Sequence, residues 1–200
     1  MKLYVRKIED YSDAGTEFLE EARRTRLKRI KNPKVRSECI AAGMLLREAL
    51  ADYGYPVGEE PLELAYGPEG KPELKRIENS NRSTPYFCLS HSENIVVCAV
   101  DDVPVGVDVE DVKKVSSLLP KRVLSDNEYD EYCRISESKS ADAAYRYFTV
   151  CWTEKESISK LVGKGIGMDF RTIKKEDFML HTLMRTIGDV EYVITIAQYK

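Results

Sequence analysis

The sequence lacks a long apolar run, a paired cysteine motif and a hydrophobic leader. No stretch approaches the roughly 20 apolar residues that span a bilayer, and Lys2 and Arg6 stand where a signal peptide would be apolar. The five cysteines are odd in number and form no C-x-x-C, which indicates neither a disulfide framework nor a zinc site. We therefore expect a cytoplasmic protein with reduced thiols that does not bind membranes.

The composition is that of a soluble globular protein, with 42% hydrophobic and 32% charged residues. The net charge is −3, yet eight basic residues and no acid lie between Arg23 and Arg36. The eight are Arg23, Arg24, Arg26, Lys28, Arg29, Lys31, Lys34 and Arg36. Such a run is either a solvated helix face or a site for a polyanion, held through charge-assisted bonds to phosphate. We expect no nucleic-acid partner, because the whole chain is acidic and carries no nucleic-acid motif.

The stretch Val105 to Glu110 has the character of a buried strand. Residues two apart on a strand point to the same face, so Asp108 and Glu110 are expected to lie side by side. Two neighbouring carboxylates repel each other and are costly to bury. A divalent cation removes that conflict, and magnesium typically binds one or two carboxylates plus substrate phosphates. The alternative is that one of the two acids faces solvent at the strand end.

The stretch from Trp152 to Gly165 has helical character up to its glycines. Trp152, Glu156 and Lys160 are four residues apart and therefore share one face of that helix. A third carboxylate and a cation would thus stand together beside an aromatic ring. The alternative is a surface Glu–Lys pair next to a core tryptophan.

The remaining patterns predict the order strand–helix–helix–strands, repeated once. The expected strands are 2–9, 62–66, 95–100, 105–110, 177–187 and 190–198, and the expected helices are about 15–30, 33–54, 126–132 and 143–161. Asn32-Pro33 is a start signal for the second helix, and Ser125 with Glu128 forms a capping-box pattern for the third. The polar stretches 73–84 and 136–142 are expected to be loops.

Together, the two motif stretches resemble the Sfp-type 4′-phosphopantetheinyl transferase superfamily. Its members carry a G-[VI]-D-[VI]-E strand and, further along, a W-x-x-K-E-[SA]-x-x-K-x-x-G-x-G helix. Both patterns occur here without a gap, as Gly106 to Glu110 and then as Trp152, Lys155, Glu156, Ser157, Lys160, Gly163 and Gly165. Either motif alone is weak, whereas the pair in this order is specific.

Shorter matches extend the resemblance over nearly the whole chain. They are Leu45-Leu46-Arg47, Gly70-Lys71-Pro72, Phe87-Cys88-Leu89-Ser90-His91-Ser92 and the set Arg122, Leu124, Ser125, Glu128 and Tyr129. Two positions depart from the family pattern, since Cys88 replaces an asparagine and Val123 an aromatic residue. The resemblance implies an α+β fold of two similar halves in a pseudo-twofold arrangement, here residues 1–100 and 101–200. We expect a monomer.

The resemblance also implies the reaction, which transfers 4′-phosphopantetheine from coenzyme A to a serine of an apo acyl or peptidyl carrier protein and releases 3′,5′-ADP. It assigns Mg²⁺ to Asp108, Glu110 and Glu156, with Glu156 or a metal-bound water as the base. Lys160 would stabilise the diphosphate or protonate the leaving group. The residues expected to hold coenzyme A are Arg23, Arg26, Lys71, Ser90, His91 and Lys155.

Two alternatives remain open from the sequence. One is a non-catalytic coenzyme A-binding or regulatory protein on this fold, and the other is an unrelated magnesium-dependent phosphohydrolase. The family of carrier protein that serves as substrate, and the tolerance for acyl-coenzyme A, are open as well.

Overall fold

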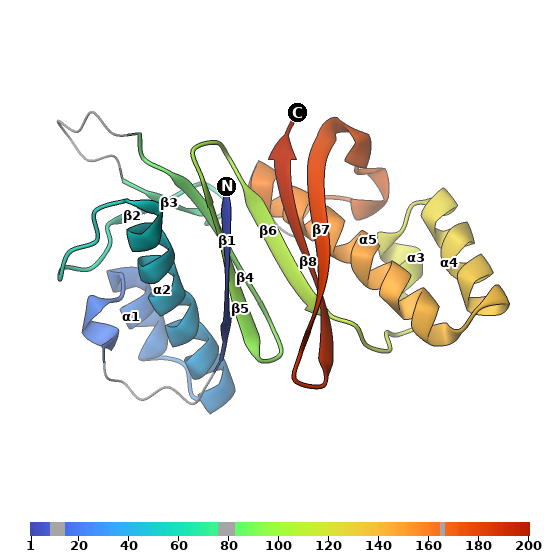
Figure 1. Ribbon diagram of the computed structural model, residues 1–200, viewed down its shortest axis with the longest axis horizontal. Coiled ribbons are helices and arrows are strands. Elements are labelled where there is room, and N and C mark those ends of the chain that lie inside the picture. Colours follow the sequence, from blue (N-terminus) through green and yellow to red (C-terminus); the bar gives the residue numbers. More distant parts are fainter. Residues whose placement is uncertain (9–14, 76–82, 165–166) are drawn as a thin grey trace. The chain divides into compact units, whose positions relative to one another are not determined.

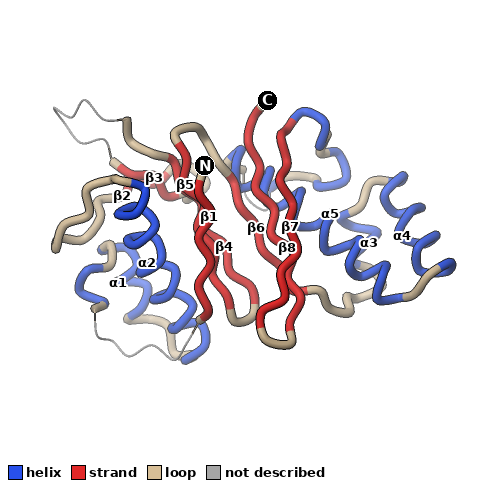
Figure 2. Tube along the Cα trace, in the orientation of Figure 1, coloured by secondary structure: helices blue, strands red, loops and turns tan. Residues whose placement is uncertain are grey.

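The computed structural model describes residues 1–8, 15–75, 83–164 and 167–200. The chain divides into two compact units, Met1–Val105 and Gly106–Lys200. Both units combine helices with an antiparallel sheet, so the predicted α+β class is confirmed (Figures 1 and 2). The predicted division into domains at residue 100 stays a prediction, and Gly165 of the helix motif lies outside the described residues.

The first unit contains a three-stranded sheet covered by one long helix. Its elements are β1 (Lys2–Lys7), a 3₁₀ turn η1 (Thr16–Phe18), α1 (Glu21–Leu27), α2 (Pro33–Tyr53), β2 (Leu64–Tyr66), β3 (Pro72–Leu74), β4 (Tyr86–Ser92) and β5 (Ile95–Asp101). The sheet order is β1-β5-β4, and β2 pairs with β3 in a separate hairpin. The side chains of α2 pack on Val96, Cys98 and Val100 of the central strand to form the core of this unit.

The second unit has the same order of strand, helices and closing hairpin. Its elements are β6 (Gly106–Asp111), α3 (Leu119–Val123), α4 (Asp126–Ser138), α5 (Ala141–Val162), the 3₁₀ turns η3 (Phe170–Thr172) and η4 (Lys175–Asp177), β7 (Phe178–Ile187) and β8 (Val190–Tyr199). The sheet order is β6-β8-β7. In both units the last strand is therefore the central one and pairs with the first, which gives the two halves a common topology.

The local signals in the sequence account for the ends of the helices. The Asn32 side chain accepts hydrogen bonds from the backbone of Lys34 and Val35, and α2 ends at Gly54, which takes a left-handed φ of 94°. At α4 the predicted capping box is present, with Ser125 and Glu128 bonded reciprocally.

Several element predictions were wrong in extent, among them the helix expected at 126–132, which continues to Ser138. The helix expected at 15–30 is only η1 and α1, because the extended and fully buried Leu19 interrupts it; Glu20 then occupies the N-cap position of α1 without a side-chain capping bond. The loop expected at 136–142 is reduced to Lys139 and Ser140, since Ser140 caps α5 by accepting a bond from Ala143. The loop expected at 73–84 begins inside β3, and its residues 76–82 lie outside the described ranges.

Two predictions made from the composition concern the state of the cysteines and the presence of membrane-spanning helices. All five cysteines carry free thiols, and four of them are buried. None of the helices in the described ranges combines the length and apolar character needed to cross a bilayer.

Candidate functional site

In the second unit, α5 lies directly against β6. A β-carbon on Gly106 would stand 2.1 Å from the carbonyl oxygen of Ser157 and 2.6 Å from the backbone nitrogen of Leu161. Only glycine therefore permits the helix to approach the strand this closely. The approach brings the motif residues of α5 over the strand that carries Asp108 and Glu110.

The centre of this arrangement is a contact between Asp108 and Lys160. The Asp108 carboxylate is almost fully buried, and its Oδ1 accepts a hydrogen bond of 2.6 Å from Lys160 Nζ. A buried carboxylate is tolerated when a cation of opposite charge lies beside it. Lys160 is 30% exposed, so its ammonium can also reach a ligand at the surface.

Glu156 belongs to the same cluster. Burial raises the pKa of Glu156, the negative charge of Asp108 adds to the rise, and Lys160 offsets part of it. The structure thus brings Asp108, Glu156 and Lys160 together. Glu110 is half-buried and, two residues beyond Asp108 on β6, shares its face of the strand.

Hydroxyl groups tie α5 to the strands behind this cluster. Thr195 of β8 lies opposite Asp108 in the strand register. Its hydroxyl is 2.9 Å from that of Thr153 on α5 and 3.0 Å from that of Thr182 on β7. This chain of hydrogen bonds fixes the distance between α5 and the sheet.

The carboxylates of this cluster would supply some, but not all, of the oxygen ligands that a hard divalent cation needs. Asp108 and Glu156 are close enough for the charge of one to raise the pKa of the other, and oxygen ligands of this kind suit magnesium when substrate phosphates complete the shell. Across the described ranges, however, no three His, Cys, Asp or Glu side chains converge as a ready-made metal site. The residues present therefore fit a cation that is shared with a ligand.

Lys155 is the one motif residue that the structure assigns differently from the sequence analysis. Its side chain is 1% exposed, and its ammonium contacts Glu128 Oε2 at 2.6 Å and the carbonyls of Val123 and Phe170 at 3.0 and 2.8 Å. An ammonium has three donors, and these contacts engage all of them. Our expectation that Lys155 binds coenzyme A is therefore corrected: the residue is an internal anchor.

In the first unit, two of the expected nucleotide-binding residues line one cavity. Arg23, Arg26 and Gly70 lie around a cavity of about 260 Å³, together with Glu20, Ala22, Tyr66 and Pro72. Arg26 is exposed, whereas Arg23 is largely occupied: its Nε is 2.5 Å from Glu20 Oε1 and its Nη1 is 3.1 Å from the Cys39 carbonyl. Arg26 is therefore better placed than Arg23 to meet a ligand phosphate.

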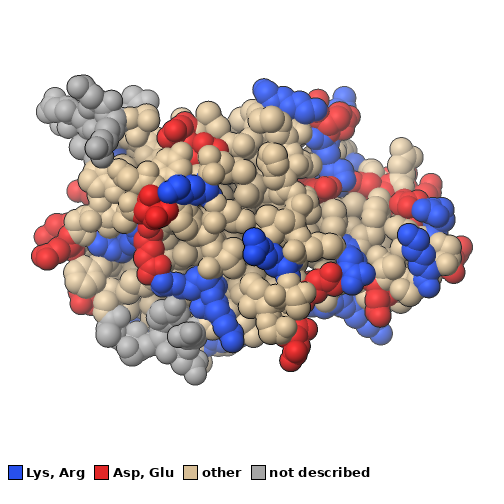
Figure 3. Space-filling view, viewed as in Figure 1, with Lys and Arg blue, Asp and Glu red and all other residues tan. Residues whose placement is uncertain are grey.

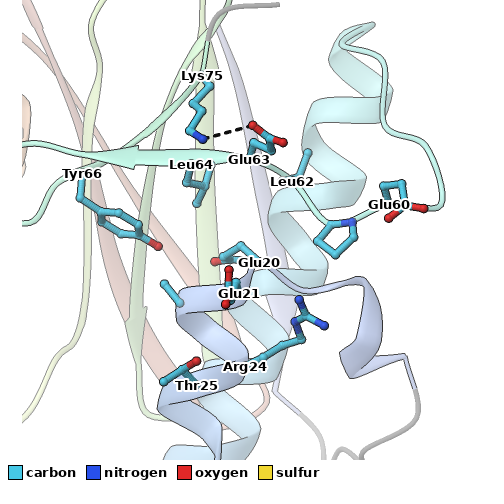
Figure 4. Close-up of a pocket in the computed structure, with 12 residues that line it drawn as sticks. Glu20, Glu21, Arg24, Thr25, Glu60, Leu62, Glu63, Leu64, Tyr66 and Lys75 are labelled. Atoms are coloured by element: carbon cyan, nitrogen blue, oxygen red, sulfur yellow. Dashed lines mark hydrogen bonds and ion pairs between the residues drawn. The ribbon is translucent and has the colours of Figure 1, made fainter.

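A larger cavity of about 830 Å³ adjoins this one through shared walls. It lies between α1 and the segment leading into β2, and Glu20, Glu21 and Arg24 face Leu62, Leu64 and Tyr66 across it (Figure 4). Arg47 of the Leu-Leu-Arg motif holds neighbouring backbone in place, since it donates to the carbonyls of Phe18, Gly58 and Glu60. Arg47 therefore holds in place the backbone segments that lie next to the cavity.

The remaining expected residues of the first unit lie on β4 and beside β3. His91 faces the side of the sheet that α2 covers, where its Nδ1 is 3.9 Å from Glu38 Oε2. Ser90 is buried and, as the adjacent residue, points to the opposite face. His91 is half exposed at 52% of its side chain, and Lys71 immediately precedes β3. The strand geometry therefore favours His91 over Ser90 as a side-chain contact to a ligand.

Sequence analysis missed Glu20, Glu38 and Lys175 as neighbours of the expected residues. Glu20 precedes the basic run and pairs with Arg23, and Lys175 pairs with Glu128, which is bonded to Lys155. The three-residue spacing of Glu20 and Arg23 is a helical signal that could have found that pair, whereas Glu38 and Lys175 lie too far along the chain from their partners for sequence spacing to select them. On the face in Figure 3, basic and acidic side chains are interspersed over the described residues.

Comparisons with known proteins agree on one family. A family model described as the 4′-phosphopantetheinyl transferase superfamily matches residues 104–188. A 4′-phosphopantetheinyl transferase of Bacillus subtilis is 29% identical over 84% of this chain and 73% of its own length. The transferase Sfp of B. subtilis is 26% identical over 76% of this chain and 63% of its length. The transferase HetI of a Nostoc species is 32% identical over 71% and 58%, so the chain spans between half and three quarters of these relatives.

Proposed function

Because the chain belongs to the Sfp-type 4′-phosphopantetheinyl transferase superfamily, we propose that it moves the 4′-phosphopantetheine group of coenzyme A onto a serine of an apo carrier protein. The observation that carries this proposal is the cluster of Asp108, Glu156 and Lys160 where α5 meets β6. The serine Oγ forms a bond to the phosphorus that bears pantetheine. The bond from that phosphorus to the bridging oxygen breaks, and 3′,5′-ADP leaves with the electron pair.

Glu156 is the residue that we assign to the serine proton. Burial and the charge of Asp108 raise the pKa of Glu156, which makes its ionised form a stronger base than an ordinary carboxylate. A base gains efficiency as its pKa approaches the working pH. Glu156 therefore takes the proton as the serine oxygen attacks.

Lys160 is the residue that we assign to the diphosphate. In the free protein its ammonium neutralises Asp108, and 30% of its side chain remains accessible. A bound diphosphate competes for that ammonium and stabilises it in a position next to the leaving oxygen. Magnesium held by Asp108, Glu156 and Glu110 would neutralise phosphate charge in the transition state.

In this proposal, residues of the first unit bind the nucleotide half of coenzyme A. Arg26 and His91 offer accessible cationic or hydrogen-bonding groups, and Lys71 follows Gly70 at the rim of the smaller cavity. Charge-assisted hydrogen bonds of this kind hold phosphate groups with defined geometry. We assign Arg23 mainly to support Glu20 and α2, with a secondary role toward the ligand. Ser90 stays a proposed ligand contact, although its side chain is buried.

The carrier protein is proposed to dock on the segment between β6 and α4. From Val112 to Ser125 the chain carries four basic residues and no acid, and Leu118 within it is 60% exposed. The exposed face of α4 itself is acidic, with Asp126, Asp130 and Glu137. An acidic carrier domain is therefore attracted to the basic segment and excluded from α4.

The experiment that tests the function is incubation of the protein with coenzyme A, magnesium and a panel of apo carrier proteins, read by intact mass. The expected result is a gain of one phosphopantetheine on at least one carrier, lost when magnesium is chelated and restored when it is added back. Coenzyme A binding without any mass transfer would favour a non-catalytic binding protein. Release of phosphate without a modified carrier would favour a phosphohydrolase.

A further inference from the structure

We propose that Lys155, Glu128 and Lys175 form a charge network that positions α5, so that Glu156 stands correctly over β6. The inference rests on the proposed function, in which Glu156 acts on the serine proton. The three residues touch neither the cluster at Asp108 nor a described cavity, so their effect is indirect. They are positioning residues.

Lys155 joins α5 to three separate segments. Its ammonium is bonded to the Val123 carbonyl at the end of α3, to Glu128 in the first turn of α4 and to the Phe170 carbonyl of η3. The residue is 1% exposed, so these bonds are made without competing water. A bond set in three directions holds the side chain, and through it the helix backbone, in one orientation.

Glu128 and Lys175 complete the network. Glu128 Oε2 also accepts from the backbone nitrogen and hydroxyl of Ser125, at 2.9 and 3.0 Å. Lys175 Nζ lies 2.8 Å from Glu128 Oε1 and 2.7 Å from Glu154 Oε2. Both oxygens of Glu128 thus contact a lysine. Because Lys175 also contacts Glu154, it forms a second link from Glu128 to α5, one residue before Lys155.

Because of the helix geometry, the contacts of Lys155 and Glu154 determine the direction of the Glu156 side chain. Successive residues on an α-helix are separated by about 100° around its axis. Fixing the directions of Glu154 and Lys155 therefore fixes the direction of Glu156, the next residue. A rotation of the helix would move the Glu156 carboxylate relative to Asp108, and a displacement near 1 Å at a reacting group can cost about 10²-fold in rate.

The network also gives a role to motif positions that the proposed reaction does not use. The Ser-x-x-Glu-Tyr pattern supplies Ser125 and Glu128, and the Trp-x-x-Lys-Glu pattern supplies Lys155. The structure joins them through the 2.6 Å ion pair between Lys155 and Glu128. A buried ion pair adds little net stability compared with apolar side chains but can specify one arrangement of elements.

The test compares Lys155→Met, Lys175→Met and Lys175→Arg in the full chain. We expect Lys155→Met to lower kcat by at least ~10-fold while the coenzyme A Kd measured without magnesium stays within about twofold. Lys175→Met should lower kcat less, because Lys175 is 28% exposed at the periphery of the network. Lys175→Arg should restore the rate, since a guanidinium can pair with both Glu128 and Glu154.

Trp152 supplies a readout that is independent of transfer activity. It is the single tryptophan of the chain, and its ring packs on Phe170 with centroids 5.7 Å apart. Because Lys155 binds the Phe170 carbonyl, a shift of α5 against η3 changes the surroundings of that ring. We expect a changed Trp152 emission in Lys155→Met and a wild-type emission in Lys175→Arg.

A matched control is Glu131→Gln, which removes an exposed ion pair with Arg134 on the same helix as Glu128. It should leave kcat, Kd and emission unchanged. A normal kcat per folded molecule in both methionine variants would overturn the proposal in favour of a purely structural network, and a raised coenzyme A Kd with normal kcat would make Lys155 a ligand contact. If the wild-type protein itself transfers nothing, the proposed function fails, while the emission changes still decide whether the network orients α5.

Discussion

At the scale of single residues, the proposed site depends on how charge is balanced among buried groups. Asp108 is buried because Lys160 neutralises it, and Glu156 lies close enough to Asp108 for its pKa to rise. Burial and the charge of Asp108 together make Glu156 more basic than an ordinary carboxylate. Two carboxylates and one lysine therefore have different surroundings although they lie in one cluster, which is the basis for the different roles that we propose for them.

Glu156→Gln preserves the side-chain volume and removes the charge. We expect kcat to fall by at least ~10²-fold, within the usual range for loss of a general base. Coenzyme A affinity without magnesium should barely change, because the proposed role of Glu156 concerns the serine proton and the cation. Steady-state transfer assays and calorimetric binding check this, and near-normal carrier modification by the variant would contradict the assignment.

Arg26→Ala and His91→Ala test the nucleotide contacts. Each should weaken coenzyme A binding by about 1–3 kcal/mol, the range for a lost charged hydrogen bond. Binding of dephospho-coenzyme A should weaken less if the contact is to the 3′-phosphate. Arg29→Ala is the control, since Arg29 is an exposed member of the same basic run that lines neither cavity among the described residues. Equal losses for both ligands would place the two residues elsewhere on the nucleotide.

At the scale of elements, the close packing of α5 on β6 is the feature that places the site. Gly106→Ala would insert a β-carbon where the Ser157 carbonyl stands. Overpacking of this kind costs about 1–3 kcal/mol, and a contact with rigid backbone places the cost at the upper end. Chemical denaturation should show this loss, accompanied by a lower kcat. Gly58→Ala is the control, because no atom lies within 4 Å of its β-carbon position, and an unchanged midpoint for Gly106→Ala would show that the helix can retreat freely.

The junction of α4 with α5 should respond to acid. Burial acts to raise the pKa of Glu128, but hydrogen bonds from Lys155 and Lys175 outweigh burial and lower that pKa to about 2. A carboxylate with a depressed pKa contributes stability above its ordinary pKa of 4.5, and this contribution is lost as pH falls from 4.5 toward 2. We expect a loss on the order of 1–2 kcal/mol over that window, after allowance for partial solvent screening.

The measurement is the free energy of unfolding as a function of pH for wild type and Glu128→Gln. The variant is less stable at neutral pH, and its stability should decline less between pH 4.5 and 2. Parallel curves for the two proteins would mean that Glu128 is not held in its charged form by the two lysines.

At the scale of the whole molecule, the proposed function requires a surface outside the cluster that recognises the carrier protein. Leu118→Asp should raise KM for the carrier by about tenfold, as expected for an exposed apolar anchor in a basic surround. The value of kcat at saturating carrier and the Kd for coenzyme A should remain normal. Val103→Asp, at a side chain of similar exposure outside this segment, is the control. If KM for the carrier changes equally in both variants, the basic segment is not the docking surface.

The family could be recognised from the resemblance of its two motif stretches. The order of elements and most helix boundaries could be predicted because they depend on short-range periodicity and on capping residues. Asn32, Ser125 and Gly54 act within a turn of their own positions, so their meaning is visible without the fold. The same holds for the face shared by Glu156 and Lys160, which helical spacing determines.

Only the tertiary structure could separate Lys155 from Glu156. The two residues are adjacent in one motif, yet Lys155 is buried against Glu128 and two carbonyls while Glu156 lies beside Asp108. Likewise, Arg23 and Arg26 belong to one basic run, but Arg23 is held by Glu20 whereas Arg26 is exposed. Sequence spacing determines the direction in which a side chain leaves its element. Whether that direction leads to solvent or to an opposite charge depends on segments far away in the chain, and only packing brings those segments there.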